Sequence, residues 1–110
     1  METQARRLNL HEKLCDILGS RNVYYQPPES IKMKYPCIVY HRTANRTYRA
    51  DNVKYMHRDS YTVTYISKNP DDDVPDNLEQ SFDYIRRENR YVGDGLYHDP
   101  YFLYYKGGTK

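Results

Sequence analysis

The largest group of residues that could do chemistry is a run of carboxylates in the second half of the chain. Asp71, Asp72 and Asp73 are consecutive, and Asp76 follows three residues later. Clustered carboxylate oxygens are ligands for calcium and magnesium, but the run lacks the glycine and the closing glutamate of an EF-hand loop. Negative charge at a helix N-terminus is a sufficient explanation for it. The sequence therefore predicts no metal site.

Residue types used in nucleophilic and acid–base catalysis are scattered. The four histidines fall at no metal-ligand spacing and stand beside no nucleophile motif. They are His11, His41, His57 and His98. The two cysteines form no zinc-binding pair, so Cys15 and Cys37 are expected to be buried free thiols. The sequence predicts no enzyme activity and no cofactor.

A second group combines basic and aromatic residues over positions 42–58. Its candidate interface residues are Arg42, Arg46, Tyr48, Arg49, Lys54 and Tyr55. Basic side chains between aromatic rings bind single-stranded nucleic acid, and Tyr and Arg are also favoured anchors of protein–protein contacts. A plain exposed hairpin is the third alternative. The polar stretch 43–54 is expected to form a long hairpin loop or arm.

A first helix is expected over about residues 3–18. Its apolar residues fall at i, i+4, i+7 and i+8, which is one face of a helix. They are Leu10, Leu14, Ile17 and Leu18. Gly19 follows as the C-terminal stop. Residues 23–25 are expected to form a short extended piece, and Pro27 and Pro28 break regular structure after it.

A second helix is expected over about residues 75–88. The side chain of Asp73 is expected to cap its N-terminus, and Pro75 suits its first turn. Its buried stripe consists of Leu78, Phe82 and Ile85.

Four strands complete the expected fold. Period-2 alternation predicts a strand over 55–67, and an apolar run predicts another over 35–42. Two short strands follow at 90–93 and 101–105. The order α-β-β-α-β-β favours an α+β fold, with two helices on one face of a small antiparallel or mixed sheet.

Composition fits one domain over residues 1–110, with flexible ends at about 1–4 and 107–110. The chain has 14 tyrosines, which supply apolar surface that Leu, Ile, Val and Phe would otherwise provide. Charge is uneven: residues 1–70 carry a balance of +6 and residues 71–110 a balance of −4. Opposite patches of this kind can meet in a head-to-tail ring, although both can also be solvated faces. No stretch is long and apolar enough for a membrane span, so a protein made in the cytosol is expected.

Several stretches of the sequence resemble a small neck protein of long-tailed bacteriophages, called a tail terminator, tail completion or tail-to-head joining protein. The stretches are LHEKLC at 10–15, LGSRNVYYQPP at 18–28, YPCIVY at 35–40, YTVT at 61–64, PDNL at 75–78 and the end at 101–105. The resemblance covers about residues 8–105. It rests on sequence patterns, with no catalytic signature among them.

The resemblance implies a structural virion protein without a reaction or a cofactor. Proteins of this kind form a six-membered ring at the head-proximal end of the tail tube. The ring ends tube polymerisation, contacts the tail tube protein and the head-completion protein, and lets DNA pass through its centre. The implied location is the virion neck, after assembly in the host cytoplasm.

Two alternatives stay open at this point. A head-completion or adaptor protein occupies the neighbouring ring of the same neck. A nucleic-acid-binding protein would use the basic, Tyr-rich arm. In the ring, the arm is expected to reach a neighbouring subunit or the tail tube. The acidic segment 71–79, which includes Asp71, Asp72 and Asp73, is expected to face the basic half of the next subunit.

Overall fold

A computed structural model describes residues 2–43, 46–50 and 53–105, with side chains over 5–43 and 60–105. Within these residues it contains two helices and seven strands. In chain order they are α1 (Glu2–Leu18), β1 (Val23–Tyr25), β2 (Cys37–Arg42), β3 (Arg46–Ala50), β4 (Val53–Ser67), α2 (Val74–Ser81), β5 (Ile85–Arg87), β6 (Tyr91–Gly93) and β7 (Leu96–Tyr105). The fold is α+β with a mixed sheet and two helices, as predicted. β1 coincides with the extended piece expected over 23–25, β3 lies within the stretch expected as an arm, and β5 is an additional strand. The expected flexible ends fall on α1 at residues 2–4 and outside the described residues at 107–110.

The first helix forms as its apolar stripe predicts. Leu10 and Leu14 are fully buried, and Ile17 and Leu18 pack against the same core. Gly19 has a φ of 85°, and its N–H donates to the carbonyl of Cys15 at 2.8 Å. This left-handed residue closes the last turn of α1, a conformation that glycine adopts without strain.

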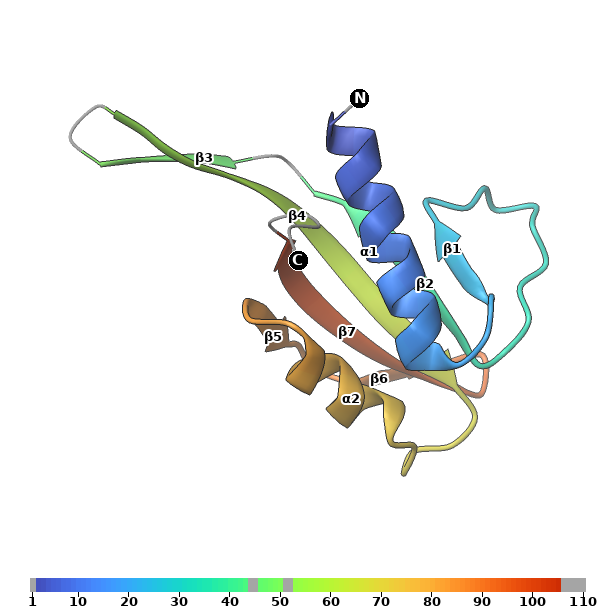
Figure 1. Ribbon diagram of the computed structural model, residues 1–110. Helices are drawn as coiled ribbons and strands as arrows, with labels where there is room; N and C mark the ends of the chain where they lie inside the picture. Colours follow the sequence, from blue (N-terminus) through green and yellow to red (C-terminus); the bar gives the residue numbers. More distant parts are fainter. Residues whose placement is uncertain (1, 44–45, 51–52, 106–110) are drawn as a thin grey trace.

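The long strand β4 is the centre of the sheet. It pairs antiparallel with β2 on one side and with β7 on the other. β1 extends the sheet beyond β2 in parallel orientation, while β5 and β6 share the outer edge of β7. Both helices lie on one face of this sheet (Figure 1).

Tyrosine supplies much of the core between the sheet and the helices. The fully buried tyrosines come from three adjacent strands, and they are Tyr40, Tyr61, Tyr65 and Tyr101. They pack in one cluster with leucines of α1 and α2. Each buried ring keeps its hydroxyl bonded, and that of Tyr101 donates to the carbonyl of Pro75 at 3.2 Å. Burial raises the pKa of Tyr101 to about 12. Both cysteines are buried free thiols, as predicted.

The prediction of a helix over 75–88 is wrong at its C-terminal end. α2 ends at Ser81, Phe82 has extended backbone, and Ile85 begins β5. The backbone of β5 pairs with β7, and just before it the N–H of Tyr104 donates to the carbonyl of Tyr84 at 2.9 Å. This pairing satisfies part of the outer edge of β7, which a helix could not do.

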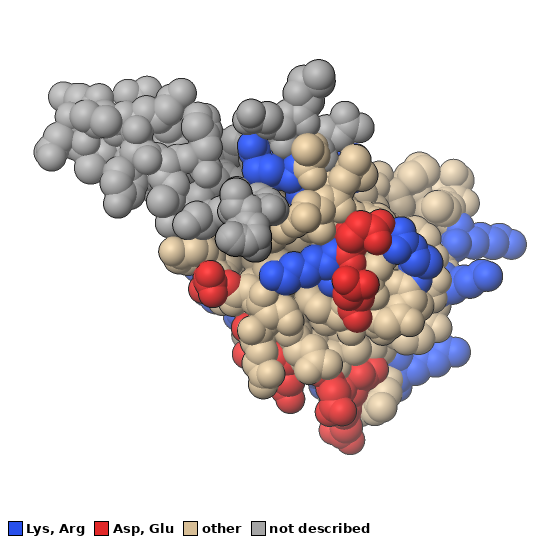
Figure 2. Space-filling view, viewed as in Figure 1, with Lys and Arg blue, Asp and Glu red and all other residues tan. Residues whose placement is uncertain are grey.

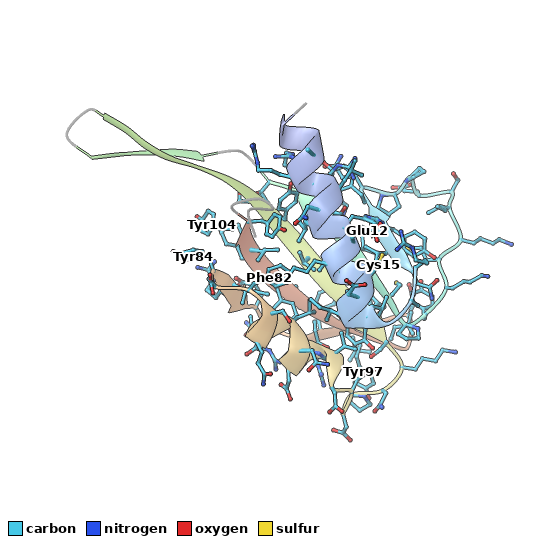
Figure 3. All side chains as sticks on the ribbon, viewed as in Figure 1. Glu12, Cys15, Phe82, Tyr84, Tyr97 and Tyr104 are labelled. Atoms are coloured by element: carbon cyan, nitrogen blue, oxygen red, sulfur yellow. The ribbon has the colours of Figure 1, made fainter. Side chains whose placement is uncertain are left out.

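Phe82 nevertheless lies in the core, as predicted (Figure 3). The ring meets Tyr105 edge to face at 6.1 Å between centroids, and the Lys13 ammonium lies 4.6 Å from its centroid on the α1 side. Ile85 is only half-buried and reaches the same cluster from a strand. The spacing of Leu78, Phe82 and Ile85 is therefore that of a buried helix face, although the helical backbone ends at Ser81.

The last strand starts earlier than predicted. β7 runs from Leu96 through Pro100 to Tyr105, whereas the prediction placed a strand only over 101–105. Pro100 is tolerated because its carbonyl accepts from the N–H of Glu88 at 2.9 Å. In an antiparallel strand the N and O of one residue point to the same side. The nitrogen of Pro100 therefore faces the gap between β5 and β6, and no bond to β4 is lost.

Candidate assembly interface

The predicted arm corresponds to β3 and the first part of β4, which pair as an antiparallel two-stranded ribbon. We call residues 46–50 and 53–58 the ribbon. The strand predicted over 55–67 begins at Val53, and the ribbon extends away from the helices (Figure 1). The molecule is correspondingly elongated, with extents of 48 × 27 × 27 Å.

The backbone register of the ribbon places like charges opposite each other. Arg46 pairs with Arg58, and Arg49 pairs with Lys54. The register shifts between Tyr48 and Arg49, so Tyr55 has no Cα partner in the ladder. The structure thus places three candidate residues, Arg46, Arg49 and Lys54, in two rungs of the ribbon that are separated by two others, while their side chains lie outside the described residues.

Arg42 belongs to the body of the protein rather than to the ribbon. Its backbone N–H donates to Oε1 of Gln26 at 3.1 Å, and its guanidinium donates to the hydroxyl of Tyr61 at 3.1 Å. The guanidinium also lies over the ring of Tyr61, 5.1 Å from its centroid. Arg42 is half-buried, so its role at the root of the ribbon is to tie β2 to β4.

The acidic residues divide into one that points inward and two that stay exposed. Asp72 accepts from the hydroxyl of Tyr65 through Oδ2 and from the N–H of Val74 through Oδ1, at 3.1 Å in the second case. Burial, with the Asp72 carboxylate beside it, raises the pKa of Tyr65. Asp71 and Asp73 are exposed. The predicted side-chain cap by Asp73 is wrong: Asp73 is the N-cap residue, but its carboxylate accepts no capping bond, and Asp72 bonds the first N–H instead.

The exposed carboxylates continue along α2. We call residues 71–83 the acidic segment, because it contains six acidic and no basic residues. Figure 2 shows acidic side chains gathered over this end of the molecule. Arg87 on β5 pairs with Glu79 and lies 3.7 Å from Asp76, so part of the charge is neutralised internally.

A polar contact that the sequence analysis missed holds the turn before α2. Arg90 donates to both carboxylate oxygens of Asp99, at 2.7 and 3.2 Å, and to the carbonyl of Pro70 at 3.1 Å. Asp99 is buried, and it pairs across the sheet with Tyr65. The sequence contains one indication of this contact. Asp99 alternates with the buried Tyr101 and Leu103 in the strand LYHDPYFLYY, and a buried carboxylate needs a cationic partner.

A second polar contact lies between α1 and β2. Nδ1 of His11 lies 2.7 Å from the hydroxyl of buried Tyr40. In a neutral imidazole this nitrogen can accept a hydrogen bond from the hydroxyl. Burial lowers the pKa of His11 below its ordinary value of 6.5.

This contact predicts an acid-sensitive step in stability. Below pH 6.5 the unfolded chain binds a proton at His11 more readily than the folded chain does, so stability falls as the pH drops from 7 toward 5. Urea unfolding at several pH values should show a shallower fall in His11→Gln, which does not titrate. An equal slope in both proteins would contradict the assignment.

The described residues hold no group of three or more His, Cys, Asp or Glu side chains arranged to bind a metal ion. Neither described helix is long and apolar enough to cross a membrane. No family model matches the chain, and comparisons with curated proteins and with solved structures find no match.

Proposed function

We propose that this chain is a structural subunit of the neck of a long-tailed bacteriophage. In this proposal it forms a ring, six-membered by the resemblance, at the head-proximal end of the tail tube. The ring ends tube polymerisation and joins tail to head in the virion, and DNA passes through its centre. No chemical reaction is involved.

The observation that supports this proposal best is the ribbon. A small α+β body with a two-stranded extension has an element that can reach beyond its own core to another subunit. Ring subunits need such a heterologous contact, because each must present a different surface to each neighbour. The proposed partners are further copies of the chain, the major tail tube protein and the head-completion protein.

Substitutions in the ribbon provide the first test of the proposed ring. Exchanging Arg46 and Arg49 for Glu should block ring formation or tail capping while the monomer stays folded. Native mass spectrometry and negative-stain microscopy would measure the ring, and circular dichroism the fold. The matched control is Lys32→Glu with Lys34→Glu, which makes the same change of charge on an exposed loop. Normal capping by the ribbon variant would contradict the role of the ribbon.

Deletion of the gene separates the two neck functions. Electron microscopy of particles from the deleted phage should show tails of uncontrolled length if the chain is a terminator. Tails of normal length beside heads that leak DNA would assign it to head completion instead. Intact virions would remove the neck proposal altogether.

Nucleic-acid binding is the second candidate. The ribbon contains four basic and no acidic residues, and a two-stranded ribbon fits the major groove of DNA. Affinity for a duplex fragment should then fall steeply as salt rises, with a slope set by the number of phosphates contacted. Binding with a shallow slope, or none at 50 mM salt, would rule this candidate out.

A further inference from the structure

We infer that the ribbon of one copy docks on the acidic segment of a second copy, so that the chain carries both halves of a head-to-tail contact. The inference deepens the proposed function, on which its biological role rests, by naming the surface that each subunit presents to its neighbour. The contact itself can be measured on the purified chain.

The ribbon alone is unfavourable in two respects. Its register sets Arg46 against Arg58 and Arg49 against Lys54, and like charges directly opposite each other destabilise a strand pair. In addition, β4 pairs with β7 only from Asp59 onward, so within the described strands residues 53–58 pair on one edge alone. A two-stranded ribbon is marginally stable in water. A partner with negative charge would relieve the repulsion.

The acidic segment has an excess of negative charge that complements the basic ribbon. Within the described part of the chain, the carboxylates of Asp71, Asp73 and Asp83 accept no hydrogen bond and form no ion pair, and Arg87 is the one basic side chain paired to α2. The segment therefore presents negative charge that its own subunit does not use.

The contact must be between copies. The ribbon leaves the body in the direction away from α2, so it does not reach the acidic segment of its own chain (Figure 1). A surface that meets a different surface of the next copy propagates head to tail and closes into a ring where the rotation allows. Nucleic acid would also neutralise the basic residues of the ribbon, but it would not account for the negative charge of the acidic segment.

Charge reversal on each surface tests the inference. The ribbon variant is R46E/R49E, and the segment variant is D71K/D73K. The matched controls are K32E/K34E and D16K/E29K, which make equal changes of charge at other exposed positions. Sedimentation velocity at 50 mM and 500 mM salt measures self-association of the full chain.

We expect the ribbon variant and the segment variant each to associate at least about tenfold more weakly than wild type. The controls should behave as wild type, and high salt should weaken all that associate. The ribbon variant converts both like-charge rungs into opposite-charge rungs, so a loss of folding cannot explain its defect. D71N/D73N, which keeps a residue suited to the N-cap at position 73, should show a smaller loss than D71K/D73K.

Two results would overturn the inference: a wild-type chain that stays monomeric at millimolar concentration in 50 mM salt, or a ribbon variant that associates normally. If R46E/R49E then lost binding to a DNA duplex, nucleic acid would be the partner of the ribbon. The neck proposal fails separately, through intact virions after gene deletion.

Discussion

Arg90→Met is expected to lower the free energy of unfolding by about 3 kcal/mol. The substitution keeps much of the side-chain length but leaves the carboxylate of Asp99, which is 3% exposed, without its guanidinium. Arg90 itself is 36% exposed, but removal of the cationic partner of a buried carboxylate leaves an uncompensated charge, and this costs more than the pair contributed. The same change also frees the carbonyl of Pro70. Urea unfolding followed by circular dichroism measures the loss.

A second arginine–carboxylate pair of the chain provides a matched control. Arg86 pairs with Glu88 at 2.9 Å, but both side chains are exposed, at 70% and 44%. An exposed pair contributes about 0–1 kcal/mol, so Arg86→Met should be nearly neutral. In the Arg90→Met background, Asp99→Asn should recover part of the loss because it removes the buried charge. Equal effects of the two arginine substitutions would show that Asp99 is solvated in the folded chain.

Leu103→Ala is the second substitution with a large expected effect, about 3 kcal/mol of lost stability. Leu103 is fully buried on β7, where it lies between Tyr61 of β4 and Ile85 of β5 in the sheet register. A strand in the middle of a sheet cannot collapse around the missing atoms, so a cavity adds to the lost transfer energy. The midpoint of urea unfolding measures the change at constant slope.

Leu8→Ala is the control for this loss. Leu8 lies on α1 and is 48% exposed, so its truncation should change stability by less than about 0.5 kcal/mol. A loss at Leu103 no larger than at Leu8 would mean that β5 does not close the core over β7. That outcome would restore the longer α2 that the side-chain spacing predicted.

The first helix and the two central strands could be predicted because their signals are local. Leu10 and Leu14 at i and i+4, followed by Gly19, specify a helix and its end within ten residues. Alternation over residues 61–66 specifies a strand with one buried face. In each case the side-chain period and the backbone preference agree, and no distant partner has to be known.

The end of α2 could not be predicted because a distant element decides it. Ile85 continues the spacing of Leu78 and Phe82, so the local pattern favours a helix. The competing demand comes from β7, whose outer edge needs backbone partners. The first half of β7 was not predicted because it contains Pro100. A proline argues against a central strand unless its nitrogen faces an edge.

The candidate interface was predicted in residue type but not in arrangement. Composition marked the basic residues around Arg46 and the acidic residues around Asp73. It could not show that the register sets arginine opposite arginine, or that Asp72 turns inward to Tyr65. The Arg90–Asp99 contact was missed, because its two members lie nine residues apart across a turn whose path no local pattern specifies.

The continuity of β4 has a mechanical consequence. One uninterrupted strand of 15 residues forms half of the ribbon and then the centre of the sheet. A pull on the ribbon along its axis therefore acts on β4 between β2 and β7, and it strains their hydrogen bonds in shear, many at once, rather than one after another. A subunit held by its ribbon would transmit tension into its most strongly paired strand and resist being peeled apart.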